Sequence, residues 1–421
     1  MNQVARTPLR QLRLVSSADV YKAGTLAGNL RRLRDRTEFQ YLPDYLAADG
    51  PPVAWSLPPK AEAYIAPAAA VPAFFAGLLP EGRRLTALRR IVGTSADDEF
   101  SMLLAVGGDT IGDVQVVPAG EPHADTNPVM VDDFGEVIFA DLFAQAIGQH
   151  PDRIALPGVQ DKVSGQMLNV PVQGQSAGYI LKLNPPEFPH LVENERFFFR
   201  AAARTRLMVA DVELVHDRVG EPGLLVHRFD RIHESGNVRL LAVEDACQVL
   251  GRWPGDKYII STEEAITGLA QCCRAPGVAA LELYRLLVFA YLSGNGDLHA
   301  KNLAILHDPR GEWRVTPAYD LPSSAVDLPS SAVYGDRTMA LPLGGVVRQQ
   351  LSWPMLRSLG KEIGIPERLA AEVIREQTSA ARIWIEELDE LPFDANAIRN
   401  LRRLVSARMG HIEPEPSRHS H

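Results

Sequence analysis

Residues 281–302 constrain the fold of this chain more than any other stretch. Leu281 to Leu292 is almost continuously apolar, and the turn Gly294-Asn295-Gly296 follows it. This pattern predicts a buried helix that ends at the glycine turn. Beyond the next polar residues, 303–316 has two short apolar runs around a Pro-Arg-Gly turn, which predicts a β-hairpin. Several ionisable groups therefore lie on a loop between rigid elements, where functional residues are often held.

Asp297 and Asn302 lie five positions apart in this loop. Asp-x-x-x-x-Asn is the spacing of a phosphotransferase catalytic loop, in which the Asp accepts the proton of the attacking hydroxyl. The Asn and a later Asp, here Asp320, would hold the magnesium ion that bridges the phosphates. Lys301 would lie near the transferred group and offset the charge that develops there. The alternative is a capped loop in which the Asp and Asn satisfy turn amides, but the flanking helix, the hairpin and the second acidic motif favour phosphotransfer.

The composition is ordinary for a globular protein of two or three domains. The chain has 421 residues, of which 46% are hydrophobic and 23% charged. No apolar run approaches the roughly 20 residues that cross a bilayer, and residues 1–10 lack the apolar core of a signal peptide. We therefore expect a cytoplasmic protein with no membrane partner. The three cysteines are too few for a disulfide framework and do not match a zinc site.

The net charge of −9 argues against a surface devoted to nucleic acid. Arginine clusters within 31–36, 83–90 and 399–408 are typical of solvated helix faces. Any role on DNA would more plausibly need a basic partner.

Residues 1–150 are predicted to form the first domain, a mixed α/β subdomain. Alternation within 11–48 predicts a small antiparallel sheet, and helical periodicity takes over between Tyr64 and Val92. A break at Leu79-Pro80-Glu81-Gly82 separates two helices. Further helices are expected at 97–106 and 131–148, with a strand within 109–117 and a domain boundary near 149–153.

The second region, 151–410, opens with a β-rich part at about 151–231. Gly158, Val159, Gln160, Asp161 and Lys162 form a turn before a strand, and the backbone amides of such a loop can cover phosphate oxygens.

Lys182 lies inside the apolar strand 179–183, so it must face solvent, a carboxylate or a ligand phosphate. Glu193 or Glu195, at the start of the next helix, could pair with Lys182 as in kinases. Both glutamates also suit a helix N-terminus on dipole grounds, and the residues alone do not choose between them.

The strand 223–227 leaves the small sheet for a region that is mainly helical, about 232–410. In a kinase-like arrangement this exit is the hinge of an ATP-binding cleft, and backbone groups near His227 and Phe229 would meet the adenine. Residues 411–421 are polar, contain two prolines and are expected to be a disordered tail.

Together these motifs resemble the HipA family of serine/threonine kinases, the toxins of bacterial HipA–HipB toxin–antitoxin pairs. The resemblance implies an α+β fold: a protein-kinase-like bilobal domain, with a small β-rich lobe and a larger helical lobe, behind an N-terminal mixed α/β subdomain. The motifs that carry it are Phe39-Gln40-Tyr41, Leu78-Leu79-Pro80-Glu81-Gly82, Gly107-Gly108-Asp109, Gly158-Val159-Gln160-Asp161-Lys162, Glu193-Asn194-Glu195, Arg228-Phe229-Asp230-Arg231, Gln248 with Lys257-Tyr258, Asp297-Leu298-His299-Ala300-Lys301-Asn302 and Tyr319-Asp320.

Carried over position by position, the resemblance implies that Asp297 is the catalytic base. It makes Asn302 and Asp320 the magnesium ligands and Lys182 the lysine on the ATP phosphates, with Gly158 to Lys162 in the phosphate-covering loop. It also implies ATP and Mg²⁺ as cofactors and a serine of an aminoacyl-tRNA synthetase as the target, so that translation and growth stop. The implied partner is HipB, a helix-turn-helix antitoxin that represses the operon, with operator DNA contacted mainly through it.

Two features depart from the family pattern. Many members carry a regulatory serine two residues before the Pro-Gly pair, where this chain has Ala155, so we expect no phosphate at that position. In addition, Leu321 to Val326 recurs in tandem as Leu328 to Val333, each copy preceded by an aspartate. We expect a longer mobile loop with Asp320 still in place; the alternative is that Asp327 competes for the metal.

Three classes of function are therefore considered. The favoured class is an active kinase toxin, because Lys182, Asp297, Asn302 and Asp320 are all intact. The second is an inactive relative that serves as corepressor with an antitoxin. The third is a metal-dependent hydrolase that uses His299 with Asp297, but no second His–Asp pair supports it, and His299 is more typical of a residue that supports the catalytic loop.

Overall fold

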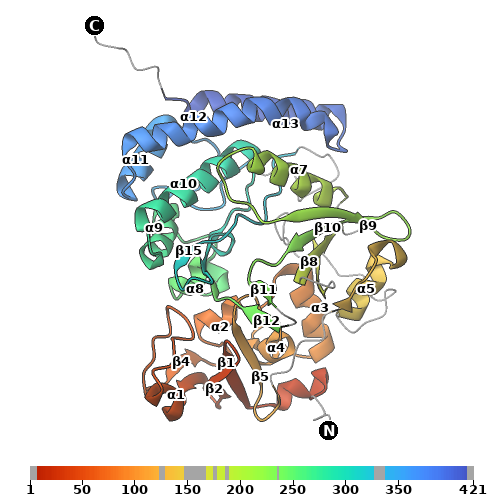
Figure 1. Cartoon of the computed structure of the whole chain (residues 1–421), viewed down its shortest axis with the longest axis vertical. Coiled ribbons are helices and arrows are strands. Elements are labelled where there is room, and N and C mark those ends of the chain that lie inside the picture. Colours follow the sequence, from red (N-terminus) through yellow and green to blue (C-terminus); the bar gives the residue numbers. More distant parts are fainter. Residues whose placement is uncertain are drawn as a thin grey trace.

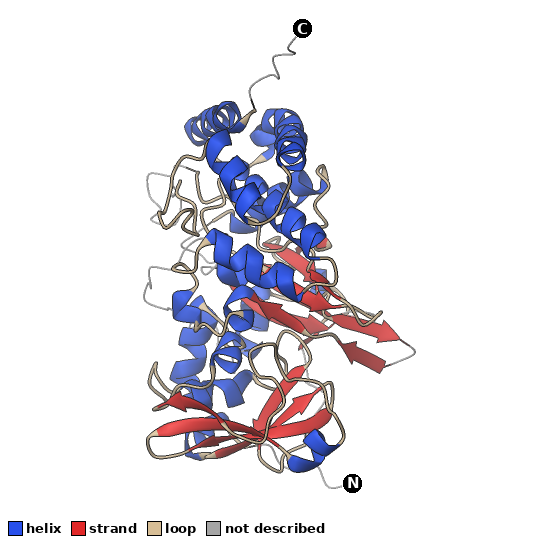
Figure 2. Cartoon of the chain, turned by 90° about the vertical axis from the view of Figure 1, so that its left-hand side faces the viewer, coloured by secondary structure: helices blue, strands red, loops and turns tan. Residues whose placement is uncertain are grey.

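The N-terminal region folds around an antiparallel sheet with the strand order β4-β3-β2-β1-β5 (Figures 1 and 2). The structure, a computed structural model, describes residues 7–122, 129–146, 167–173, 178–184, 189–234, 237–326 and 337–414. Buried and half-buried side chains alternate along β1 and β3, so that one face of the sheet carries a core. The strands are β1 (Ser17–Lys22), β2 (Thr25–Arg32), β3 (Arg36–Tyr41), β4 (Tyr64–Pro67) and β5 (Val114–Pro118).

Short helices pack against this sheet. Phe39 of β3 contacts Phe75 of α2 with ring centroids 5.1 Å apart, and both belong to one buried cluster with Phe100 of α4. The helical periodicity predicted from Tyr64 is wrong at its start, because residues 64–67 pair with β3 as an edge strand. The helices are η1 (Leu9–Leu14), α1 (Pro43–Ala47), α2 (Ala73–Gly77), α3 (Gly82–Val92) and α4 (Glu99–Val106).

A second sheet, with the order β6-β7-β8-β10-β9, forms the β-rich lobe. Leu181 and Leu225 pair in register and face the core around α5, whereas Lys182 and Leu224 alternate to the face covered by α7. The elements are β6 (Val129–Met130), η2 (Phe134–Glu136), α5 (Phe139–Ala146), β7 (Leu168–Gln173), β8 (Gly178–Leu183), α7 (Leu191–Ala203), β9 (Val212–His216) and β10 (Pro222–His227).

Residues 129–146 lie with this second sheet, although the expected boundary near residue 150 assigned them to the N-terminal subdomain. β6 runs parallel to β7, and Phe139 and Phe143 share a core with Val170 and Leu181. The helix expected at 131–148 begins only at Phe139, because η2 occupies residues 134–136. We propose that the division between the two regions falls between Pro118 and Val129.

The helical lobe is built around α10 at the other end of the molecule from the N-terminal sheet (Figure 1). Helix α10 is long and apolar enough to cross a membrane by length and composition, but 72% of its apolar window is buried, as in the core helix of a globular lobe. The side chain of Phe289, on α10, belongs to the same hydrophobic core as Trp384 of α12. The helices are α8 (Ala246–Val249), η4 (Pro254–Asp256), α9 (Thr262–Cys272), α10 (Pro276–Ser293), α11 (Trp353–Glu362), α12 (Glu367–Trp384), η6 (Ile385–Glu390) and α13 (Ala395–Ile412).

Small strands flank the predicted catalytic loop. The loop lies between α10 and β14, contains the turn η5 (Ala300–Asn302), and is followed by the expected hairpin of β14 (Ala304–His307) and β15 (Trp313–Val315). Strand β13 (Val243–Asp245) joins β14, within the region that was expected to be mainly helical. The hairpin of β11 (Arg231–Glu234) and β12 (Asn237–Leu240) was not expected. At the C-terminus, α13 continues two residues into the predicted tail.

Buried charges fix the N-terminal region to the end of β10. Arg228 and Arg231 both donate to Asp109 Oδ1, over 2.8 and 3.1 Å, and both donate to the Thr110 carbonyl. Each also contacts Asp230, at 2.9 and 2.8 Å, and Gly112 N donates to Asp230 Oδ2. This cluster accounts for the Arg-Phe-Asp-Arg motif, because each cation has carboxylate partners in the junction.

Replacing Gly294 with alanine is expected to destabilise the fold by about 1–3 kcal/mol. Gly294 ends α10 at φ +74°, and an added Cβ would lie 2.6 Å from Cβ of Ala325. Gly277→Ala is the matched control, because it lies in the first turn of α10 with open space around it. Urea unfolding of both variants tests this; equal stabilities would contradict it.

Candidate active site

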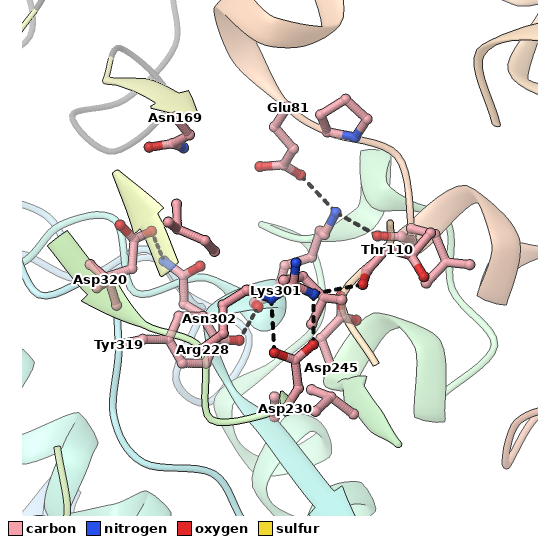
Figure 3. Close-up of a pocket in the computed structure, with 18 of the residues that line it drawn as sticks. Glu81, Thr110, Asn169, Arg228, Asp230, Asp245, Lys301, Asn302, Tyr319 and Asp320 are labelled. Atoms are coloured by element: carbon pink, nitrogen blue, oxygen red, sulfur yellow. Dashed lines mark hydrogen bonds and ion pairs between the residues drawn. The ribbon is translucent and has the colours of Figure 1, made fainter. Parts of the chain in front are cut away.

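A cavity of about 330 Å³ lies where the N-terminal region meets both lobes (Figure 3). The N-terminal region contributes residues 77–81 and 109–111 to its wall. The β-rich lobe contributes Lys182 and the end of β10, and the helical lobe contributes the loop after α10 and Asp320. Lys182, His227, Phe229, Asn302 and Asp320, which were expected to bind ATP or metal, therefore meet at one cavity, whereas Asp297 is not among the residues that line it. Gly158 to Lys162 lie outside the described residues, together with Ala155 and Asp327.

Lys182 is held between two carboxylates. Its ammonium group lies 2.6 Å from Glu195 Oε1 and 2.8 Å from Asp320 Oδ1. Burial alone would lower the pKa of Lys182, but Asp320 and Glu195 outweigh it and raise the pKa above the ordinary value. Of the two glutamates that the sequence left open, Glu195 makes the pair. Glu193 instead contacts His190 and Asn184 at the helix start.

Asp320 adopts an unusual backbone conformation for a residue with a side chain, at φ +59°. Such left-handed conformations cost on the order of 1–3 kcal/mol and cluster at functional sites. Here several contacts hold Asp320: the Asn302 side-chain amide donates to its Oδ2 at 3.1 Å, and Asn295 donates to its carbonyl at 3.2 Å. In this backbone conformation the carboxylate of Asp320 contacts both Lys182 and Asn302.

Asp297 is 2% exposed and held by its neighbours. Its backbone N–H donates to Asn295 Oδ1 at 2.9 Å, and its carbonyl accepts from Asn302 Nδ2 at 2.9 Å. The hydroxyl of Tyr258 donates to Asp297 Oδ1 at 2.9 Å. A carboxylate positioned by a phenol and a tight loop is suited to accept a proton from a hydroxyl.

The side chains of Asn302 and Asp320 suit a magnesium ion. Their oxygens are the hard ligands that Mg²⁺ prefers, and this ion commonly takes one or two protein ligands plus water and substrate phosphates. Within the described ranges, no group of three or more His, Cys, Asp or Glu side chains forms a metal site of its own. The arrangement therefore fits a metal that arrives with a phosphate substrate.

Lys301 and His299 face the N-terminal region. The ammonium group of Lys301 lies 3.2 Å from Glu81 Oε1 and donates to the Gly77 carbonyl at 3.2 Å (Figure 3). His299 is buried, stacks edge-on against Tyr258 with centroids 5.2 Å apart, and has its Nε2 3.9 Å from Glu81. That Lys301 offsets the charge that develops on the transferred phosphoryl group stays a prediction.

The end of β10 forms the other end of the cavity. His227 and Phe229 both line it, as expected for a hinge beside an adenine ring. Phe229 packs against Tyr319 with centroids 5.9 Å apart, and Tyr319 donates to the Lys301 carbonyl. Across the cavity, the buried Oδ1 of Asn169 has no hydrogen-bond partner among the described residues, so it is available to a ligand donor.

Two family models match the chain. Residues 18–117 match the HipA N-terminal domain, and residues 154–385, more than half of the chain, match the HipA-like C-terminal domain. A protein of Sinorhizobium fredii named Putative kinase Y4mE is 30% identical over 380 residues, which are 85% of this chain and 88% of that protein. This chain belongs to the HipA family.

Other HipA-family proteins extend the comparison. The serine/threonine-protein kinase toxin HipA of Shewanella oneidensis is 30% identical over 274 residues, covering 59% of this chain and 62% of that protein. A solved structure of the Shewanella oneidensis HipA in complex with HipB and its operator DNA matches with a TM-score of 0.71 and 23% identity, over 94% of this chain and 96% of that one. The match confirms the predicted kinase-like α+β fold.

Several residues of this HipA-family site were not among the predicted site residues. Glu81, Tyr258 and Asn295 contact the predicted catalytic loop or lie within it, and Arg228 and Asp230 border the cavity. Glu81 and Tyr258 stand in motifs that carried the family resemblance, but no spacing rule links them to Asp297. The motifs themselves were the signal that could have found them.

Replacing His299 with glutamine is expected to make this HipA-family fold less sensitive to acid. Burial and the nearby Lys257 lower the pKa of His299 from 6.5 to about 3, so the ring is neutral in the fold. Between these pH values the unfolded chain binds a proton that the folded chain does not, so the free energy of unfolding falls as the pH falls. At about pH 4 this loss is on the order of 3 kcal/mol.

Urea unfolding of both proteins at about pH 7 and pH 4 measures the difference. The wild type should lose more stability on acidification than His299→Gln. Equal losses would contradict a neutral, buried His299.

Proposed function

We propose that this chain is an ATP- and Mg²⁺-dependent serine/threonine protein kinase that acts as the toxin of a HipA–HipB pair. The observation that supports this best is one geometry: Lys182 joins Glu195 to Asp320, Asp320 contacts Asn302, and Asn302 contacts the backbone of Asp297. Strand lysine, helix glutamate, metal-binding Asp and Asn, and catalytic base are the recurring parts of a protein-kinase site.

Each residue has a definite part in the proposed reaction. Asp297 orients the serine hydroxyl of the substrate and accepts its proton as the serine oxygen bonds to the γ-phosphorus of ATP; the bond from that phosphorus to the bridging oxygen breaks, and ADP leaves. Lys182 binds ATP phosphate oxygens and is held for this by Glu195. Asn302 and Asp320 would hold Mg²⁺, and the bound ion would draw negative charge from the phosphates. His227 and Phe229 line the place of the adenine.

A relative supports the proposed partner, and the resemblance of the sequence motifs supports the proposed substrate. The Shewanella oneidensis HipA was solved with HipB and operator DNA, so we propose a HipB-like helix-turn-helix antitoxin for this chain. Its net charge of −9 favours contact with the operator mainly through that antitoxin. The proposed substrate is an aminoacyl-tRNA synthetase in the cytoplasm, whose phosphorylation would stop translation and growth.

Labelling of a cell lysate tests the substrate. The purified protein is incubated with Mg²⁺, ATP labelled in its γ-phosphate, and either lysate or purified tRNA synthetases. We expect one dominant labelled band, identified by mass spectrometry as a synthetase phosphorylated on serine. Labelling of another protein would replace the proposed substrate, and tight ATP binding without any transfer would favour an antitoxin-bound corepressor.

A further inference from the structure

The carboxylate of Glu81 reaches from the N-terminal region into the catalytic loop of the helical lobe (Figure 3). Glu81 lies in the turn between α2 and α3. Its Oε2 is 2.7 Å from Lys257 Nζ and its Oε1 is 3.2 Å from Lys301 Nζ. One carboxylate therefore joins two lysines that are 44 positions apart in the sequence.

Each of these two lysines directly precedes a residue that holds the proposed catalytic base, Tyr258 in one case and Asn302 in the other. Lys257 is adjacent to Tyr258, whose hydroxyl donates to Asp297 Oδ1, and the Lys257 carbonyl accepts from Ala300 N at 3.1 Å. Lys301 stands in the same loop as Asp297, with Tyr319 donating to its carbonyl. Fixing both ammonium groups thus limits the motion of Tyr258 and of the loop relative to each other.

The charges of this cluster support an ionised Glu81. Its side chain is 33% exposed, into the cavity, while those of Lys257 and Lys301 are 19% and 11% exposed. Burial would raise the pKa of Glu81, but Lys301 and Lys257 outweigh it and lower the pKa to about 2. Glu81 is therefore a carboxylate anion held between two ammonium groups.

Attachment of the N-terminal region does not require these ion pairs. The cluster of Arg228 and Arg231 with Asp109 and Asp230 already fixes it to the end of β10. Trp55 N also donates to the buried Glu244, at 3.0 Å. The contacts of Glu81 are instead confined to the catalytic loop and the segment that supports it.

We propose that Glu81 is a positioning residue for phosphoryl transfer: by holding Lys257 and Lys301 together, it makes the N-terminal region an integral part of the active site. This inference rests on the proposed kinase function. Glu81 acts on the rate of transfer through Tyr258 and Asp297, and has little part in binding ATP, because Lys182 and the end of β10 do that.

The test measures kcat and the KM for ATP in the full chain with Mg²⁺. In Glu81→Gln we expect kcat to fall about tenfold or more, with KM changed by no more than about twofold. Glu81→Asp should recover part of kcat, because it keeps the charge on a side chain one methylene shorter. Glu62→Gln, on the exposed surface of the same region, is the control with the same chemical change and should match the wild type.

A double-mutant cycle connects Glu81 to Lys257. Lys257→Met should lower kcat to a similar extent, and the double variant should be little worse than either single one, because the second change removes a contact that is already lost. If circular dichroism shows that Glu81→Gln does not fold, the kcat values of Lys257→Met and Glu81→Asp still test whether Glu81 is a positioning residue.

Three results would overturn the inference: an unchanged kcat in folded Glu81→Gln, a loss that resides entirely in KM, or strictly multiplicative effects in the cycle. These outcomes differ from failure of the proposed function. If the wild type transfers no phosphate, the kinase function is wrong, whereas a wild type and Glu81→Gln that transfer equally refute only the part given to Glu81.

Discussion

Replacing Asp297 with asparagine is expected to lower the rate of phosphate transfer about 100- to 10,000-fold while the affinity for ATP changes little. The amide keeps the shape of the side chain but cannot take the proton from the attacking hydroxyl. Asp297 contacts Tyr258, Asn295 and Asn302 rather than Lys182, so the nucleotide contacts should persist. Single-turnover transfer and calorimetric titration with ATP measure the two effects separately.

Asp308→Asn provides the matched control for this variant. Asp308 accepts hydrogen bonds from the backbone of Arg310 and Glu312 in the turn after β14, outside the loop that contains Asp297. It should transfer phosphate at a rate close to that of the wild type. An Asp297→Asn protein as active as this control would remove Asp297 from the mechanism.

Replacing Lys182 with methionine is expected to weaken ATP binding strongly, to abolish most transfer and to destabilise the fold. Glu195 is 0% exposed, and without Lys182 it and Asp320 lose their shared cation. Leaving a buried charge without its partner costs about 3–5 kcal/mol. Urea unfolding measures the loss of stability, and calorimetric titration with ATP measures the loss of affinity.

Lys22→Met separates loss of stability from loss of function. Lys22 is 8% exposed and pairs with Asp113 at 2.8 Å, outside the cavity. It should lose stability to a comparable extent but keep its affinity for ATP. If Lys182→Met binds ATP as well as Lys22→Met does, Lys182 is not a phosphate ligand.

Local spacing predicted the position of the loop after α10 and the elements that flank it. Asp297 and Asn302 lie in one short loop after a strongly apolar helix, so residues within about twenty positions of each other defined both the loop and the elements around it. Asp320 follows the expected hairpin directly. The strand with Lys182 was also evident, because one lysine among apolar residues is a strong signal.

The sequence pattern alone could not show that Glu195, rather than Glu193, pairs with Lys182. Residues two apart on a helix point in nearly opposite directions, at about 100° per residue, so the choice between Glu193 and Glu195 depended on how α7 lies on the sheet. That is set by the packing of Phe198 and Val192 in the core rather than by any pattern within the helix.

The contacts that the N-terminal region makes with the site could not be predicted from local sequence patterns. Glu81 and Lys301 are 220 positions apart, and Arg228 is 119 positions from Asp109. Their contacts join regions that are distant in the sequence, and such packing leaves no periodicity in either segment. Short edge strands such as β4 and β6 were missed for a related reason, since their pairing with distant strands decides their conformation.

Transfer of the γ-phosphate is the measurement that tests the central claim most directly. Purified wild type and Asp297→Asn would be incubated side by side with labelled ATP and a serine-containing protein substrate found in the lysate, with Mg²⁺ or with a chelator. The account predicts label on serine for the wild type with Mg²⁺, and almost none with the chelator or in Asp297→Asn. Binding of ATP by the wild type without transfer, or transfer that persists in Asp297→Asn, would contradict it.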